Sequence, residues 1–501
     1  MIAGRQTLSL PKTVQTDRTD GDRPFELAVY DVLLPCRQFV VTHKVAELGR
    51  VSMTAEFLLR LLRSVDGMDE TDFGTFFGFD SLESGYVIRE AEESGYVARK
   101  NGRLWLSMTG RGLFRDGADE PQIYDVDTKT VTAGFDLLSI APAEREPLSR
   151  FELKLPELKV EDVGKLSGAR KLVPAAFHRF YGEFRSRFGP AATKKRALYS
   201  VDHVRPADRF SSLVRIVARS RVGRPGFPEP DLSEWKTGYE LDDRSPVIER
   251  SAAFLDDLKT FRRPDDAGAY GLLAEIAGDS IGEFMNRGEL NVSKLFKAAV
   301  AREVDTRSDS PVTPLEDALF TVPMGGSLFT AGNVRRFFEA LGYATRLRKH
   351  RPQTLFWLIP QVTAWGATRV LPTTLDQIEK QLGTPGIQDE EFPPRSVAFV
   401  AGEPPRHVLE AFDLTVSGPD FGSGPAAIEV LVVPNLVAAV QVHAPIGAIQ
   451  AFPVPLGVLS FDERVVRRAQ DALLNYLPFL TIASGKSANA DPRAFIEEAL
   501  G

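Results

Sequence analysis

Two carboxylates and a lysine between residues 136 and 154 are the residue types whose spacing could support catalysis. Asp136 opens the run "DLLSIAP", and Glu152 and Lys154 follow in "FELKL", separated by one leucine. Carboxylate oxygens are ligands that Mg²⁺ prefers, and a lysine can stabilise charge on a phosphate under attack. Because residues two apart on a strand share a face, the spacing predicts a metal site at Asp136 and Glu152 with Lys154 beside it.

The stretch 134–159 resembles the core of the PD-(D/E)xK nucleases, in which two acids and a lysine lie on adjacent strands. The resemblance implies a Mg²⁺-dependent nuclease with Asp136, Glu152 and Lys154 as catalytic residues. The chain departs from the motif at Phe135, where the family has proline, and Glu-x-Lys recurs at Glu157. A non-catalytic interpretation therefore stays open, in which 150–158 is an amphipathic edge strand.

Few other residues indicate chemistry. Cys36 is the only cysteine and the six histidines are scattered, so we expect no zinc site. The glycine-rich stretches lack the spacing of a P-loop or a dinucleotide fingerprint, so neither ATP nor NAD is expected. The C-terminal layout resembles phospholipase D-like nuclease domains, but alanine and proline follow His443, which implies a catalytically silent relative. We expect no cofactor, except Mg²⁺ if the chain is a nuclease.

A strongly basic segment follows the candidate metal site. From Arg170 to Arg224 there are fourteen arginines and lysines against three acids, in a chain whose net charge is −7. Cations neutralise phosphates and exposed rings stack on bases, so interleaved phenylalanines favour contact with a polyanion. The helical spacing of the rings is also typical of a buried stripe. The predicted contacts here are Arg179, Arg185, Arg187, Lys194, Lys195 and Arg196.

An Asn-Gly pair at residues 101–102 lies between two alternating runs, which is a strong hairpin signal. Helices are predicted before it, from Thr54 (N-capped by Ser52 or Thr54), over 70–78, and from Asp80 or Ser81 to Gly95. Three helices followed by a hairpin, together with "LSMTGRGLF", resemble a winged-helix domain over residues 51–116. The resemblance implies the fold and leaves the function open.

The third of these helices is acidic, which argues against reading DNA bases in the usual way. Its polar positions are Glu83, Arg89, Glu90, Glu92 and Glu93. Four acids and one base are unfavourable in a phosphate-lined groove. Phosphate contact through the hairpin and the next helix is more favourable, with the cations Arg99, Lys100, Arg103, Arg111 and Arg115. The alternative is a protein-docking module.

The remaining elements predict an α+β multidomain chain. We expect strands at 24–35, 38–42, two within 122–142, and at 150–158, 196–204 and 212–222, a helix at 169–188, and a loop at 223–235. Strands and helices alternate after residue 311, which predicts a partly parallel sheet. The expected divisions are a flexible arm (1–22), a winged-helix domain (23–120), a basic mixed α/β domain (121–245), a helical segment with linker (246–310) and an α/β domain (311–501).

Together these patterns favour an intracellular, DNA-associated protein over an enzyme. No signal peptide or long apolar run is present, so we expect a cytoplasmic protein without a membrane partner. The expected partners are DNA or another polyanion and further proteins. The organisation is typical of non-catalytic subunits or regulators of bacterial nucleic-acid-handling systems, anti-phage defence among them. A PD-(D/E)xK nuclease and a protein–protein adaptor are the alternatives.

Overall fold

The computed structural model is an α+β chain whose described residues form two compact units. The first unit takes them from segments 1–35, 144–161 and 211–501, and the second from segments 36–143 and 162–210. We expected contiguous domains, but two long strands, β1 and β6, each contribute to both units. The described residues are 23–48, 52–114, 121, 124–160, 163–188, 196–235, 245–305, 320–348, 352–383, 394–422, 424–485 and 492–501. The predicted arm and most of the predicted linker lie outside them.

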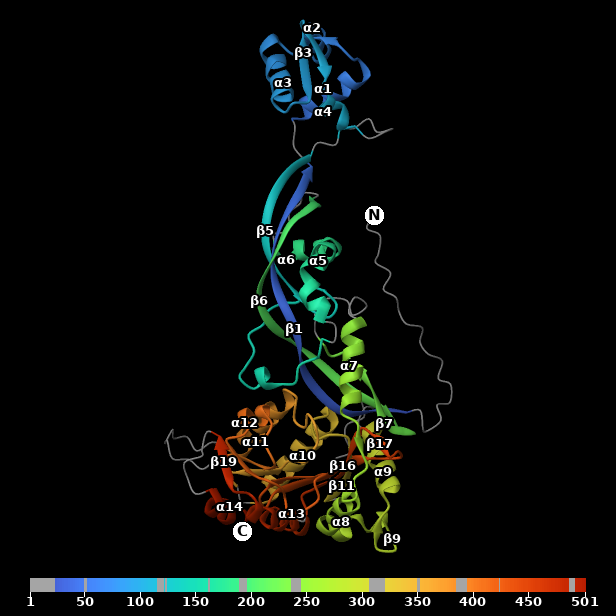
Figure 1. The fold of residues 1–501 in the computed structure, drawn as a ribbon, viewed down its shortest axis with the longest axis vertical. Helices are drawn as coiled ribbons and strands as arrows, with labels where there is room; N and C mark the ends of the chain where they lie inside the picture. Colours follow the sequence, from blue (N-terminus) through green and yellow to red (C-terminus); the bar gives the residue numbers. More distant parts are fainter. Residues whose placement is uncertain are drawn as a thin grey trace. The chain divides into compact units, whose positions relative to one another are not determined.

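Four strands form one antiparallel sheet in the order β5-β1-β6-β7. They are β1 (Pro24–Leu48), β5 (Tyr124–Asp136), β6 (Arg196–Arg221) and β7 (Arg224–Asp231). The pairs of short strands predicted at 24–42 and 196–222 are each one continuous strand, which corrects those predictions. Long-range pairing explains the continuity, since β1 and β5 stay in register from Cys36–Asp136 to Leu48–Tyr124 (Figure 1).

The proline-rich segment predicted as a loop at 223–235 instead contains β7. In the pairing of β7 with β6, Pro230 lies opposite Ala218 and Glu229 lies opposite Arg219. β7 is at the edge of the sheet. Proline has no N–H to donate to a neighbouring strand. An edge strand tolerates proline because one of its two sides has no neighbouring strand to pair with. The local turn composition was therefore overridden by pairing with a strand that precedes it.

Residues 52–114 form a small helix–hairpin module within the second unit. Its elements are α1 (Met53–Ser64), β2 (Met68–Asp69), α2 (Glu70–Phe77), α3 (Ser81–Glu93), β3 (Val97–Lys100), β4 (Arg103–Leu106) and α4 (Met108–Gly112). Ser52 caps α1, and Asp80 forms a reciprocal capping box with Glu83 on α3. Asn101 and Gly102 both have positive φ, as a two-residue hairpin turn requires. Leu58, Leu62 and other apolar side chains fill its core.

The rest of the second unit is a sheet–helix layer (residues 36–48, 124–143 and 163–210). It combines parts of β1, β5 and β6 with α5 (Val163–Arg179) and α6 (Tyr181–Phe188), which replace the single helix predicted at 169–188. Phe39 and Phe135 on the strands pack with Phe177 and Phe184 on the helices. The hydrophobic core of the layer therefore lies between the sheet and the two helices.

The first unit contains an eight-stranded mixed sheet in the order β11-β18-β16-β15-β12-β13-β14-β19. β12, β13 and β14 are parallel, so the partly parallel sheet predicted after residue 311 is confirmed. All residues of the inner strands are buried, and Figure 1 shows helices above and below them, as a doubly covered sheet requires. The strands are β11 (Thr321–Gly325), β12 (Leu355–Leu358), β13 (Ser396–Ala401), β14 (Leu414–Gly418), β15 (Ile428–Val433), β16 (Val437–Pro445), β18 (Pro453–Ser460) and β19 (Ile482–Gly485).

Helices alternate with these strands and precede them. The helical stretch predicted from residue 246 contains α7 (Ser245–Asp257), α8 (Asp266–Ala277) and α9 (Val292–Asp305). The later helices are α10 (Ala331–Leu347), α11 (Val370–Leu382), α12 (Arg406–Ala411), α13 (Glu463–Tyr476) and α14 (Pro492–Leu500). Short strands β8 (Thr260–Phe261) and β17 (Gln450–Ala451) pair, as do β9 (Met285–Asn286) and β10 (Glu289–Leu290). Within the described residues, no helix combines the length and apolarity needed to cross a bilayer.

Candidate functional site

Asp136 ends β5 and is fully buried, and its carboxylate is engaged by the loop that follows. It accepts hydrogen bonds from the backbone N–H groups of Leu138 at 3.0 Å, Ser139, and Ala141 at 3.2 Å. These bonds close a turn in which Ile140 has positive φ. A carboxylate that satisfies three backbone donors has a structural task, and it belongs to the second unit.

The prediction of a strand at 150–158 is wrong. Glu152 and Lys154 lie in a single turn of 3₁₀ helix, Glu152–Lys154, in the first unit. A 3₁₀ helix has three residues per turn, so positions two apart do not share a face as they would on a strand. Capping produces the turn: the Glu152 carboxylate accepts from the Ser149 backbone N–H at 2.6 Å, and Ser149 Oγ accepts from the Glu152 N–H.

The side chain of Glu152 is also bound by a partner far away in sequence. Its second carboxylate oxygen forms an ion pair with the Arg369 guanidinium. Burial raises the pKa of the Glu152 carboxyl, but the Ser149 N–H and Arg369 outweigh burial and hold the pKa below its ordinary value. Among the described residues, which include Asp136 and Glu152, no group of three histidine, cysteine or acidic side chains could hold a metal ion. Asp136 and Glu152 each accept hydrogen bonds from donors of the protein itself.

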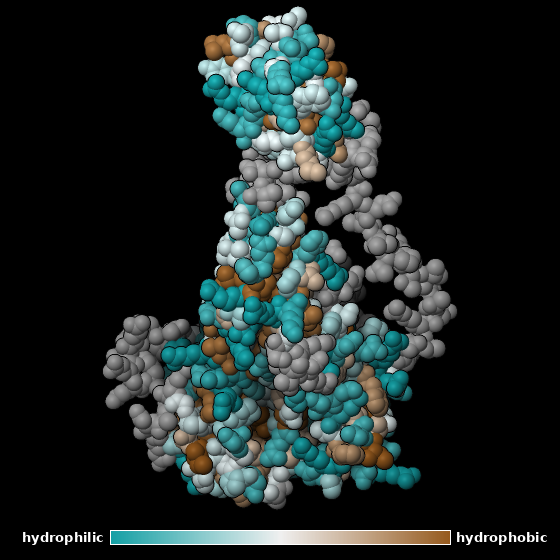
Figure 2. All heavy atoms as spheres, turned by 45° about the horizontal axis from the view of Figure 1, so that its top comes forward, coloured by the Kyte–Doolittle hydropathy of each residue, from teal (hydrophilic) through white to brown (hydrophobic). Residues whose placement is uncertain are grey.

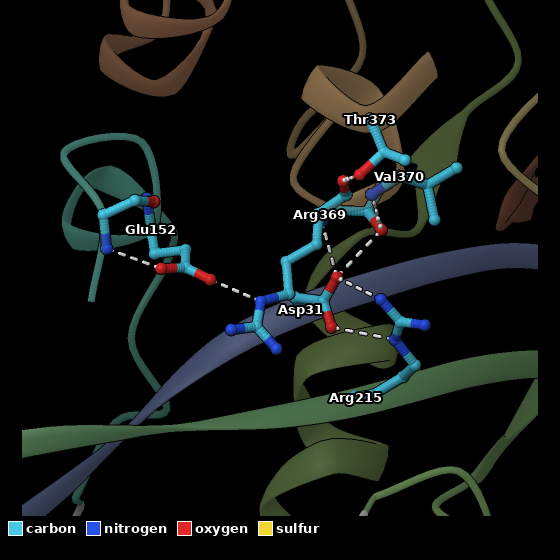
Figure 3. Close-up of polar contacts among 8 residues, drawn as sticks. Asp31, Glu152, Arg215, Arg369, Val370 and Thr373 are labelled. Atoms are coloured by element: carbon cyan, nitrogen blue, oxygen red, sulfur yellow. Dashed lines mark hydrogen bonds and ion pairs between the residues drawn. The ribbon is translucent and has the colours of Figure 1, made fainter. Parts of the chain in front are cut away.

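Arg369 also belongs to a buried polar cluster centred on Asp31 (Figure 3). This cluster was not predicted from the sequence. Asp31 lies on β1 and is only 2% exposed. Its carboxylate accepts two bonds from the Arg215 guanidinium at 3.0 and 3.1 Å, one from Thr368 Oγ1 at 2.9 Å and one from the Arg369 backbone N–H at 2.6 Å. The Asp31 N–H in turn donates to the Ala367 carbonyl. An acid within the apolar run "LAVYDVLL" was the available signal.

This Asp31 cluster (Asp31, Glu152, Arg215, Thr368 and Arg369) joins four segments of the first unit. The Asp31 carboxylate lies at the start of α11, where backbone N–H groups favour negative charge. The hydrogen bonds from Arg215 to Asp31 raise the pKa of the Arg215 guanidinium, although burial by itself would lower it. Two acids face two bases, so the charges balance. The arrangement fits a structural role, in which Asp31 and Glu152 hold Thr368 and Arg369 in place before α11.

A second buried pair lies in the eight-stranded sheet. His443 Nε2 contacts one carboxylate oxygen of Glu429, and the Trp357 indole N–H donates to the other at 2.9 Å. His443 also lines a small cavity of about 20 Å³ with Tyr30 and Trp365. Such a cavity has room for about one water molecule and none for a substrate. His443 therefore has a satisfied, structural environment.

The predicted hairpin cations divide into two groups. Arg99 forms ion pairs with Glu70 at 3.0 Å and Glu92 at 3.5 Å, and Arg111 pairs with Asp66 at 2.7 Å. Lys100 and Arg103 flank the exposed turn, and in the described part of the chain neither forms an ion pair. Arg115 lies outside the described residues.

Three aromatic residues of the basic segment are turned inward, whereas Tyr199 is 68% exposed. Phe177, Phe180 and Phe184 are 1%, 6% and 4% exposed within the core of the sheet–helix layer. The prediction that these three rings stack on nucleic-acid bases is therefore wrong. The alternative prediction, that they form a buried stripe, is confirmed for them. Elsewhere on the surface of α5, Arg170, Lys171 and Arg179 are exposed.

The cations of β6 have different environments along the strand. Arg215 and Arg219 are engaged in the first unit, by Asp31 and by Asp231 respectively. Arg205 and Arg209 are exposed in the second unit and form no ion pair with any described residue. Lys194 and Lys195 lie outside the described residues, as do the side chains of Arg185, Arg187 and Arg196.

No known family model, curated protein or solved structure matches this chain.

Proposed function

We propose that this chain is a non-catalytic, DNA-associated subunit of a nucleic-acid-handling system, which contacts the phosphate backbone through the outward face of α5. We further propose that residues 51–116 are a winged-helix domain. The order of three helices and a hairpin supports this assignment, as does the two-residue turn at Asn101 and Gly102.

The observation that carries the proposal is the orientation of α5. Burial of Val173 and Phe177 against the sheet directs Lys171 to solvent, and the side chain of Arg170, beside the buried stripe, is also exposed. Neither cation forms an ion pair with any described residue, so their charge is free to meet a phosphate. Arg179 is exposed on the same helix and stands above the Phe180 ring at 5.3 Å.

Charge is also unevenly distributed within the second unit. The sheet–helix layer contains 14 basic and 7 acidic residues, whereas residues 52–114 contain 7 basic and 10 acidic residues. A polyanion is therefore attracted to the layer and repelled by most of the helix–hairpin module. Lys100 and Arg103 at the hairpin tip are the contacts that the module itself could add.

The chemistry of this surface predicts the kind of binding. With Phe177, Phe180 and Phe184 buried, α5 offers charge without base stacking by these rings, so it should bind DNA with little sequence preference and strong salt dependence. Asp136 and Glu152 are held by backbone donors and by Arg369, which supports a non-catalytic role over a nuclease.

Fluorescence anisotropy with a labelled DNA duplex across a salt series tests the proposal. The logarithm of affinity should fall with the logarithm of salt, and Arg170→Ala/Lys171→Ala should flatten the slope by about 2, roughly one per lost phosphate contact. Lys100→Ala/Arg103→Ala should flatten it further if the hairpin contributes. Both pairs are exposed, so the fold should be unaffected.

The matched control is Arg346→Ala/Lys380→Ala, which removes the same charge from exposed positions on α10 and α11. Binding that is absent, insensitive to salt, or weakened equally by the control would contradict the proposal. Mg²⁺-dependent cleavage of plasmid that is lost in Lys154→Ala would contradict the non-catalytic assignment.

A further inference from the structure

The outward face of α3 exposes large apolar side chains in an acidic setting. Leu82 and Tyr86 are 66% and 64% exposed, and they are four residues apart, so they lie side by side on the helix. Phe76, near the end of α2, is 66% exposed. Figure 2 shows hydrophobic side chains at the surface of this module among hydrophilic ones. Because Leu82 and Tyr86 are adjacent on one helix face, they form a continuous apolar contact area and not two isolated exposed side chains.

The charge around these side chains is strongly negative. Residues 66–93, which include α2 and α3, contain nine acids and one base, Arg89. Arg99 forms ion pairs with Glu70 and Glu92, and Arg111 forms one with Asp66, so two positive charges offset part of this negative charge. Asp72 and Glu93 are exposed and form no ion pair with any described residue. Arg89 lies on the same face of α3 as Leu82 and Tyr86, but nine acids against Arg89, Arg99 and Arg111 leave the surface with a net negative charge beside its apolar contact area.

The local structure of α3 is well defined, so this surface is not a frayed end. Asp80 accepts from the Leu82 and Glu83 N–H groups at 2.8 Å each, and Glu83 returns a bond to Asp80. On the buried side, Ile88 and Ala91 pack into the core of the module. Glu90 accepts from the backbone and side chain of Ser52, at the start of α1. Leu82 and Tyr86 are thus presented on a rigid helix.

We propose that the Leu82–Tyr86 face of α3 docks a partner protein through a basic amphipathic segment, with apolar side chains flanked by lysine or arginine. Leu82 and Tyr86 supply the apolar contact, and the surrounding acids select positive charge. Nucleic acid and anionic membranes are excluded by the same acids. The proposal is independent of DNA contact at α5.

The test uses the full chain and a labelled 18-residue peptide of leucine and lysine in amphipathic helical order. A peptide with glutamate in place of lysine is the charge control. The leucine–lysine peptide should bind, with an affinity that falls as salt rises, and the glutamate peptide should not. Leu82→Ser/Tyr86→Ser should weaken binding at least ten-fold, and Glu93→Lys should reduce its salt dependence.

Met108→Ser is the matched apolar control, because Met108 is 93% exposed on α4 outside the acidic segment. It should leave peptide affinity unchanged, as should Arg170→Ala/Lys171→Ala, which separates this surface from the DNA surface. Equal binding of both peptides, or full affinity in the double variant, would overturn the proposal. Self-association by sedimentation that is lost in Leu82→Ser/Tyr86→Ser would instead identify a second copy as the occupant.

Discussion

At the scale of single residues, Asp31 joins segments that are far apart in the sequence. It is buried, charged, and bound by one guanidinium, one hydroxyl and one backbone N–H from other segments. Removing one partner of such a cluster leaves an uncompensated charge in a site with little water. The two acids predicted to hold a metal are likewise satisfied by protein donors.

Asp31→Asn should destabilise the first unit by about 3 kcal/mol, because Arg215 loses its carboxylate. Tryptophan fluorescence during urea unfolding measures this, since Trp235, Trp357 and Trp365 all lie in that unit. Glu234→Gln is the control: Glu234 contacts Arg215 at 3.7 Å and is half exposed, so its loss should cost less than about 1 kcal/mol. Equal effects of the two variants would show that Asp31 is not the centre of the cluster.

At the scale of elements, backbone conformation at glycines can be tested in the helix–hairpin module. Gly102 has φ of +74° at the hairpin tip, and no atom would meet an added Cβ there. Gly85 lies within α3, where an added Cβ also meets open space. The two positions therefore differ in backbone conformation and not in crowding.

Gly102→Ala should destabilise the hairpin by about 1 kcal/mol, because alanine disfavours the left-handed conformation. Gly85→Ala should stabilise α3 by about 0.5–1 kcal/mol, because glycine is entropically costly within a helix. Hydrogen exchange of the full chain, resolved to peptides, should show faster exchange in β3 and β4 for the first variant and slower exchange in α3 for the second. The same direction of change in both would contradict the turn geometry.

At the scale of the whole molecule, net charge and local charge have opposite signs. The chain carries −7 overall, yet its sheet–helix layer has twice as many bases as acids. Net charge governs retention on an anion exchanger, whereas a local basic surface governs retention on heparin. The two measurements can therefore separate global from local electrostatics.

Lys171→Glu should lower the salt concentration at which the protein elutes from heparin, because it reverses charge on the outward face of α5. Lys380→Glu changes net charge equally from an exposed position on α11 and should leave heparin elution nearly unchanged. Both variants should elute later from an anion exchanger. Equal heparin shifts would show that net charge, and not the α5 surface, determines retention.

The sequence by itself determined the parts whose causes are local. Ser52 and Asp80 as caps, the Asn101-Gly102 turn and the helix that begins near Thr54 each follow from neighbours within a few residues. The alternation after residue 311 likewise predicted the parallel strands of the C-terminal sheet.

Only the tertiary structure decided the features that depend on distant partners. β7 exists because β6 pairs with it despite its prolines, and 150–158 is not a strand, because Ser149 and Arg369 hold Glu152 in a turn. The Asp31 cluster joins residues up to 338 positions apart, which no local pattern encodes. Hydrogen bonds and burial between remote segments therefore outweighed local propensity, turning Phe177 of α5 and Phe184 of α6 inward.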